Sequence, residues 1–303
     1  MPLHITTPFL RSRSQSNRLG KDVWLKMEAL QPSGSFKLRG VGAVCEAQRT
    51  AGARRFVSSS GGNAGIAVAY CGRELGVPVV VVVPESTSER ARQLIRQEGA
   101  ELIVHGAAWS QANELAQTLV GPHDAFVHPF DDPMLWQGHA SMVDEMAAHG
   151  HKPGAVLLAV GGGGLLCGVL EGLWRNRWSD VPVVAVETRG ADCYAQSLAA
   201  GRAVELATIS SVATSLGARR PCDNALDWAR KHAIHSLVVT DAEAVAAALQ
   251  FVEDQRVVVE PACGAALAAL HHGHPVLASA SDIAVIVCGG VTATVEQLKA
   301  YRF

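Results

Sequence analysis

The amino-acid sequence predicts an α/β fold of two open, doubly wound units, each with a mainly parallel sheet covered by helices. Two observations support this prediction. Short apolar runs rich in valine and isoleucine alternate with stretches of helical periodicity, first before residue 129 and again after residue 133. A Pro-Phe-Asp-Asp-Pro turn at 129–133 separates the two series. Such alternation is typical of parallel sheets with helices on their faces.

The first series begins with a strand over 23–30, then a turn, then a helix that ends near Gly52. Strand and helix alternate from there on. Strands are expected at 55–58, 78–83, 101–104 and 125–128, and helices at 63–75, 86–97 and 109–119. The second series has strands at 155–160, 181–187, 236–240 and 283–288, and helices at 165–173 and 262–270. Ligands of such folds bind beyond the carboxyl ends of the strands.

One lysine, Lys37, follows a turn signal in the stretch 31–40, Gln-Pro-Ser-Gly-Ser-Phe-Lys-Leu-Arg-Gly. Apolar residues after it recur at helical spacing, so Lys37 is expected in the first turn of a helix. The helix dipole and desolvation both favour a neutral amine there. A neutral lysine amine is a nucleophile toward aldehydes. On this stretch alone, a solvated surface lysine is the alternative interpretation.

Four consecutive glycines at 161–164 lie between an expected strand and an expected helix. Unhindered N–H groups at a helix N-terminus suit a phosphate. A dinucleotide-binding fold would also place glycines here, and Glu187 ends the next strand where an acid could bind a ribose. The glycine spacing excludes that fold, because Leu166 or Cys167 stands where its third glycine is required. A purely structural tight turn is the remaining alternative.

The segment 60–65, Ser-Gly-Gly-Asn-Ala-Gly, connects a strand to a helix and offers hydroxyl, amide and backbone donors. Such donors suit a carboxylate. Alternatively, Ser60 or Asn63 caps the helix, and both interpretations can hold together. Glu187 and the turn after it could form a site for a hard cation, or Glu187 could be an ordinary acid at a strand end. Cys288, at the end of a β-branched strand, would most often be a core residue.

The stretch around Lys37 resembles the lysine motif of the fold-type II pyridoxal-phosphate (PLP) enzymes, the tryptophan synthase beta-like superfamily. In its serine and threonine dehydratases, Pro-Ser-x-Ser-Phe-Lys-x-Arg-Gly carries the lysine that binds the cofactor covalently. Further stretches match this family in the same order and extend the resemblance from about Thr6 to the C-terminus. They are Ser58 to Gly65, His128 to Pro133, Val160 to Leu165, Glu260 to Ala265 and Val287 to Gly290. The sequence is most similar to the L-serine dehydratase branch.

The resemblance implies a role for the residues of each motif. Residues implied at the cofactor are Phe36, Lys37, Asn63, Gly161, Gly162, Gly163, Gly164, Leu165 and Cys288. Residues implied at the substrate are Ser60, Gly61, Asn63, Ala64 and Phe130. Residues implied at a monovalent cation, expected to be potassium, are Glu187, Ala191, Leu216 and Ala218. Lys37 would be catalytic, and Cys288 would be a neutral partner of the pyridine nitrogen. Biosynthetic threonine dehydratases carry histidine at the position of Ala64, so the alanine favours serine dehydratase.

The resemblance also implies the domain organisation and the reaction. The N-terminal segment would join the C-terminal unit, giving a large PLP-binding domain of residues 1–39 and 134–303 and a small inserted domain of 40–133, with the cofactor between them. The implied reaction is β-elimination of L-serine to pyruvate and ammonia. L-threonine is an expected second substrate, because one extra methyl group changes discrimination only about 10- to 200-fold. Alternatives are a serine racemase, a β-replacement synthase, or a PLP-binding protein without appreciable turnover.

Composition narrows the class of partner. The 303 residues carry 26 basic and 28 acidic side chains and no long basic run, so neither nucleic acid nor an anionic membrane is expected. No apolar run is suited to spanning a bilayer, and the N-terminus shows no targeting segment. The seven scattered cysteines indicate a reducing compartment, and we expect a cytoplasmic protein. A small amino acid is the expected partner, and a homodimer the expected assembly.

Overall fold

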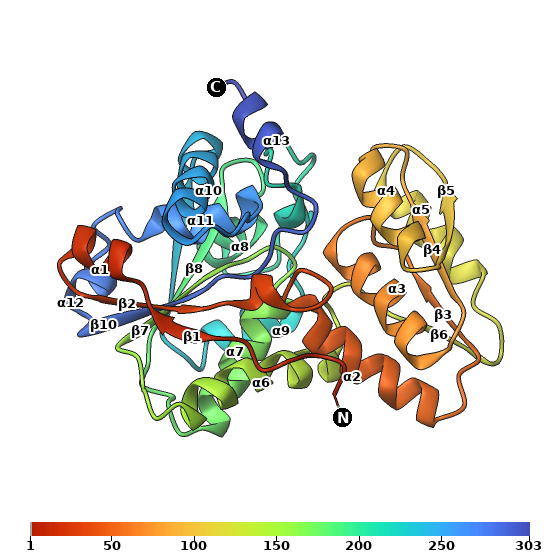
Figure 1. Ribbon diagram of the computed structural model, residues 1–303, viewed down its shortest axis with the longest axis horizontal. Helices are drawn as coiled ribbons and strands as arrows, with labels where there is room; N and C mark the ends of the chain where they lie inside the picture. The colour runs from red at the N-terminus through yellow and green to blue at the C-terminus, as the bar shows by residue number, and fades with distance from the viewer. Residues whose placement is uncertain (1) are drawn as a thin grey trace.

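Two sheets organise the computed structural model, which describes residues 2–303 (Figure 1). The larger has six strands in the order β1-β2-β10-β7-β8-β9, and the smaller has four in the order β5-β4-β3-β6. Within the described residues, every pair of neighbouring strands is parallel except β1 and β2. The predicted α/β class with parallel sheets is therefore confirmed.

The large sheet collects strands from both ends of the chain. Its strands are β1 (Phe9–Arg11), β2 (Asp22–Lys26), β7 (Ala155–Ala159), β8 (Val183–Thr188), β9 (Ile234–Val239) and β10 (Asp282–Ile286). The accompanying helices are α1 (Arg13–Leu19), α6 (Pro133–Ala148), α7 (Gly164–Arg175), α8 (Cys193–Ala200), α9 (Asp223–Ala229), α10 (Asp241–Gln255), α11 (Pro261–Ala269), α12 (Pro275–Ser279) and α13 (Val295–Ala300). Every residue of β7, β8 and β10 is buried, as expected for central parallel strands covered on both faces. In Figure 1, α10 and α11 lie on one side of the sheet, and α6 and α7 on the other.

The small sheet is formed by one continuous segment. Its strands are β3 (Arg55–Ser58), β4 (Val79–Val83), β5 (Glu101–Val104) and β6 (Asp124–Phe126), and its helices are α3 (Asn63–Leu75), α4 (Glu89–Gln97) and α5 (Trp109–Thr118). Alternate residues of β4 face opposite sides, because side chains of a strand alternate between its faces. Val80 and Val82 pack with Ala112 and Ala116 of α5, while Val81 belongs to the main core. Both faces of β4 are thus buried, while the edge strand β5 is partly exposed.

Helix α2 (Lys37–Thr50) lies between the two sheets and packs against both α3 and α6 (Figure 1). Glycines make the contact with α6 close. A Cβ atom on Gly40 would lie 2.5 Å from the Leu135 carbonyl oxygen, and one on Gly138 would lie 2.6 Å from the Arg39 carbonyl oxygen. Any side chain at either position would push the helices apart, so the two glycines permit this close crossing.

The structure contains helices that were not predicted, of which α6 and α10 are the longest, and it also differs from the prediction near the N-terminus. The strand expected over 23–30 ends at Lys26, and a short 3-10 helix, η1 (Glu28–Leu30), replaces its last part. Glu28, at the start of η1, is buried in an ion cluster described below. Helix α1, with Ser12 as its cap and Gly20 in the left-handed conformation at its end, was not predicted.

The N-terminal strand β2 pairs with β10 from Asp22 against Asp282 to Lys26 against Ile286. The domain boundaries at residues 39 and 133 stay a prediction. No helix within residues 2–303 is long and apolar enough to cross a membrane.

Candidate active site

The turn before Lys37 is attached to the end of β10. The Phe36 N–H donates to the Cys288 carbonyl oxygen (2.9 Å), and the Gly290 N–H donates to the Gly34 carbonyl oxygen (3.2 Å). Gly34 has a φ of 77°, a left-handed conformation that glycine adopts without strain. Helix α2 then starts at Lys37, as predicted. Two segments that are far apart in sequence therefore place the lysine beside Cys288.

The Lys37 amine donates a hydrogen bond to the Pro129 carbonyl oxygen (2.5 Å) and lies 5.1 Å from the centre of the Phe36 ring. Burial lowers the pKa of Lys37 to about 8, while Cys288 and Glu260 act in the opposite direction. An appreciable fraction of the amine is therefore neutral near physiological pH. This is the protonation behaviour required of a lysine nucleophile.

The glycine run forms the N-terminus of α7, with Gly163 in the left-handed region at φ 96°. In residues 2–303, no hydrogen bond joins the N–H groups of Gly161 to Leu165 to a protein acceptor. The Phe130 ring lies against the run, because a Cβ atom on Gly162 would come within 2.4 Å of that ring. Five free N–H groups at a helix start form a cradle for an anion such as a phosphate.

The segment 60–65 does not cap α3 with a side chain, so this alternative is excluded. The cap residue is Gly62, whose position has no side-chain hydrogen bond. Asn63 instead donates from Nδ2 to the Glu260 carboxylate (2.6 Å), while its buried Oδ1 has no partner in the described part of the chain. Ser60 accepts a weak hydrogen bond from the Gly62 N–H (3.4 Å), Ala64 is buried, and Gly61 lies against Thr87. The amide and hydroxyl groups are thus available to a ligand.

Two further groups complete the site, and one of them was given no role in the sequence analysis. The Cys288 thiol is buried, and its interaction with the Cys263 thiol together with burial holds its pKa well above the usual range. Glu260 accepts hydrogen bonds from Asn63 and Thr292, and burial raises its pKa. The only sequence signal for Glu260 was its place in the 260–265 motif.

The residues expected at a cation lie at the end of β8 and in the segment around Leu216. Both carboxylate oxygens of Glu187 accept backbone N–H groups, from Tyr194 (2.8 Å) and Ala195 (2.7 Å). Burial raises the pKa of Glu187 to about 8. Leu216 touches the run, since a Cβ atom on Gly161 would lie 3.0 Å from its Cα atom. The Ala218 N–H donates to the Leu216 carbonyl oxygen (2.8 Å). Ala191 is buried just after the end of β8, the strand that contains Glu187.

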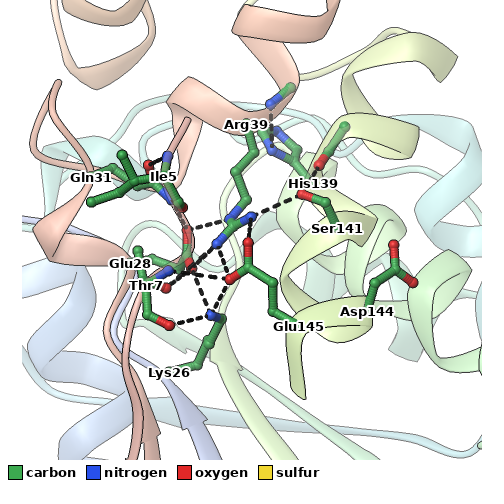
Figure 2. A network of polar contacts seen from close by, with 12 residues as sticks. Ile5, Thr7, Lys26, Glu28, Gln31, Arg39, His139, Ser141, Asp144 and Glu145 are labelled. Atoms are coloured by element: carbon green, nitrogen blue, oxygen red, sulfur yellow. Dashed lines mark hydrogen bonds and ion pairs between the residues drawn. The ribbon is translucent and has the colours of Figure 1, made fainter. Parts of the chain in front are cut away.

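A buried ion cluster, shown in Figure 2, fixes the first turn of α2. The Arg39 guanidinium contacts the Glu28 carboxylate through Nε (2.6 Å) and Nη2 (2.8 Å), and the Glu145 carboxylate through Nη1 and Nη2 (2.7 Å each). Lys26 also binds Glu145 and donates to the Thr7 carbonyl oxygen (2.8 Å). Two cations and two anions therefore balance in the interior. Although burial alone would lower the pKa of Arg39, its carboxylate partners raise it.

Together, these features define an enzyme class. A lysine amine of lowered pKa, a cradle of free N–H groups, a neutral thiol and an unpaired amide oxygen suit a phosphorylated aldehyde cofactor with a heteroaromatic ring. The orphaned polar atoms are the observation that fits such a group, because Asn63 Oδ1, Ser35 Oγ and Ser58 Oγ are buried without partners in residues 2–303.

Comparison with known proteins identifies the family. A family model described as "Pyridoxal-phosphate dependent enzyme" matches residues 1–289. A human protein named "Serine dehydratase-like" is 47% identical over 99% of this chain and 94% of its own length. The human "L-serine dehydratase/L-threonine deaminase" is 45% identical over 99% of this chain and 95% of its own length. A crystal structure of a fungal L-serine ammonia-lyase from Rhizomucor miehei has a TM-score of 0.94 and 40% identity, and covers 100% of this chain and 99% of that one. The chain belongs to the PLP-dependent enzyme family, which confirms the predicted family and cofactor.

Proposed function

We propose that this chain is a PLP-dependent ammonia-lyase that converts L-serine to pyruvate and ammonia, and L-threonine to 2-oxobutanoate. The observation that carries the proposal is the Lys37 amine, whose lowered pKa makes it both a nucleophile and a base. The human and fungal relatives are named for reactions of serine and threonine. Bound PLP supplies an electron sink for negative charge at the α-carbon of an amino acid.

Each group of the chain then has a defined task. Lys37 would hold the cofactor through its amine, and the free amine would take the α-proton of the substrate. The N–H groups of Gly161 to Leu165 would hold the phosphate, and Asn63, Cys288 and Phe36 would hold the ring. Ser60, Gly61, Asn63 and Ala64 surround the substrate carboxylate, and Phe130 forms a wall of the pocket. These residue roles are proposals drawn from the geometry and the motif positions.

The test is one absorbance experiment on the purified protein. Added PLP should give the visible absorbance of the lysine-bound cofactor, and L-serine should change it while pyruvate appears. The Lys37→Ala variant should lose both signals. D-serine as the product would instead favour a racemase, and a thioether formed in the presence of a thiol would favour a β-replacement synthase. Absorbance without turnover would leave a PLP-binding protein.

We also propose that Glu187, with the carbonyl groups of Ala191, Leu216 and Ala218, binds a monovalent cation, potassium in the first instance. The raised pKa of Glu187 supports this, because a buried carboxylate without a positive partner is unfavourable. Activity in potassium should exceed that in lithium at equal ionic strength. Glu187→Gln should weaken or abolish this preference. A wild-type enzyme indifferent to the cation would contradict the proposal.

Three further assignments complete the proposed function. We propose a large domain of residues 1–39 and 134–303 and a small domain of 40–133 with the cofactor between them, which agrees with the two sheets. We propose a homodimer, because twofold assemblies predominate among oligomers, and sedimentation of the holoenzyme tests it. We propose a cytoplasmic location, which agrees with seven free thiols.

A further inference from the structure

The imidazole of His128 caps the turn that follows β6. Its Nδ1 atom accepts the N–H of Asp131 (2.8 Å) and that of Phe130 (3.3 Å). Asparagine and aspartate side chains commonly fix turns in this way, by accepting N–H groups two and three residues ahead. The conformation of 129–131 is therefore set by one ring nitrogen.

That turn contacts both the Lys37 amine and the glycine run. The Pro129 carbonyl oxygen accepts the Lys37 amine (2.5 Å), so it holds the amine whenever the amine is not bonded to the cofactor. The ring of the next residue, Phe130, lies against Gly162. Its carbonyl oxygen lies against Gly164, 2.6 Å from where a Cβ atom on Gly164 would stand. Trp136 Nε1 donates to that same carbonyl oxygen (2.8 Å). A shift of the turn would move the amine and the phosphate cradle together.

The imidazole is suited to this task because it remains neutral. Burial, followed by the nearby Lys37, lowers the pKa of His128 to about 4. Its ring packs edge-on against Phe130, with ring centres 4.8 Å apart, and against Phe126, with centres 6.3 Å apart. Acceptance of two N–H groups at Nδ1 requires the single ring proton to reside on Nε2.

We propose that His128 is a positioning residue. It acts through Pro129 and Phe130 and fixes the position of the free Lys37 amine relative to the glycine cradle. The proposal deepens the proposed function, and its kinetic part rests on that function. It gives the histidine of the 128–133 motif a defined task, which the sequence alone did not supply.

The test compares two variants with the wild-type holoenzyme. His128→Asn keeps an acceptor at a similar distance from the backbone, whereas His128→Leu keeps the bulk and removes the acceptor. Loss of two hydrogen bonds should weaken PLP binding about tenfold or more in the leucine variant, measured by absorbance titration. The same variant should lose about tenfold in kcat with a smaller change in KM for L-serine. The asparagine variant should stay within about threefold of wild type in each quantity.

Two outcomes would overturn the proposal. One is a leucine variant with wild-type PLP affinity and kcat. The other is an asparagine variant that is as impaired as the leucine variant at equal thermal stability. If the leucine variant does not fold, nitrogen NMR of the wild-type protein decides, since Nδ1 must be unprotonated and Nε2 protonated at neutral pH. If the wild type binds PLP without forming pyruvate, the proposed function fails, while the affinity and NMR results still judge His128.

Discussion

At the scale of single residues, the main feature is a lysine whose environment favours reactivity over stability. The folded protein holds Lys37 at a pKa of about 8, against 10.5 for an ordinary lysine. Between these two pH values the unfolded chain binds more protons than the folded one, so stability increases as the pH rises from 8 to 10.5. Below pH 8 the folded protein is destabilised by the full amount that the lowered pKa of Lys37 implies.

We predict that Lys37→Met stabilises the PLP-free protein by about 1–3 kcal/mol at pH 7, because the desolvated charge is removed. The gain should disappear near pH 10.5. Thermal unfolding of both proteins at the two pH values measures this difference. The exposed Lys299 provides a control, since Lys299→Met should change stability little at either pH. A destabilised Lys37→Met variant at pH 7 would contradict the argument.

At the scale of elements, the position of α2 depends on the cluster around Arg39. The helix carries Lys37 in its first turn, and the guanidinium two residues later binds Glu28 and Glu145 from two other elements (Figure 2). The side chains of Arg39 and Glu28 are completely buried, so no water can replace Arg39 at the Glu28 carboxylate, while Glu145 is slightly exposed. Removing one partner of a buried pair leaves an uncompensated charge.

We predict that Arg39→Met lowers the free energy of unfolding by about 3–5 kcal/mol, measured by urea denaturation. Arg39→Lys should recover only part of this, because an ammonium group cannot bind two carboxylates in the planar geometry of a guanidinium. Arg175, which pairs with Asp144 at the surface, is the matched control, and Arg175→Met should cost less than about 1 kcal/mol. Equal losses of unfolding free energy in Arg39→Met and Arg175→Met would show that the buried cluster stabilises the protein no more than a surface ion pair does.

Local signals explain which elements and site residues could be predicted from the sequence. The strand 55–58, the helix 63–75 and the strand 101–104 agree with the structure to the residue, because each combines a clear period with turn residues at its ends. Lys37 could be found because its turn and helix start lie within ten residues. The ion cluster could not, because Arg39 and Glu145 are 106 residues apart. His128 stood in a matched motif, yet only the folded turn shows what its nitrogen accepts.

At the scale of the whole molecule, the site is assembled from segments that belong to different sheets. Asn63, at the start of α3 beside the small sheet, donates to Glu260, which precedes α11 beside the large one. Arg90 of α4 donates to the Val291 carbonyl oxygen (3.1 Å), a second contact between the same two parts. A cofactor held by both parts would strengthen this connection, because a ligand stabilises the conformation that binds it.

We predict that PLP slows amide hydrogen exchange in two separated segments together, at 58–65 and at 161–166. Both contain donors proposed to contact the cofactor, and exchange requires them to open to water. Helix α5 lies on the far face of the small sheet and should exchange at the same rate with and without PLP. Protection confined to one of the two segments would show that the cofactor does not join the parts.

The pairing of β2 with β10 also has a consequence for synthesis on the ribosome. All four strands of the small sheet are complete once residue 126 has emerged, so that unit can fold while the chain is still being made. The large sheet must wait, because β2 has only its antiparallel neighbour β1 until residues 282–286, which form its parallel neighbour β10, leave the exit tunnel. Throughout that interval the apolar strands β7 and β8 have no completed sheet to join. The nascent chain therefore exposes apolar strand surface, which favours aggregation, until β10 has emerged.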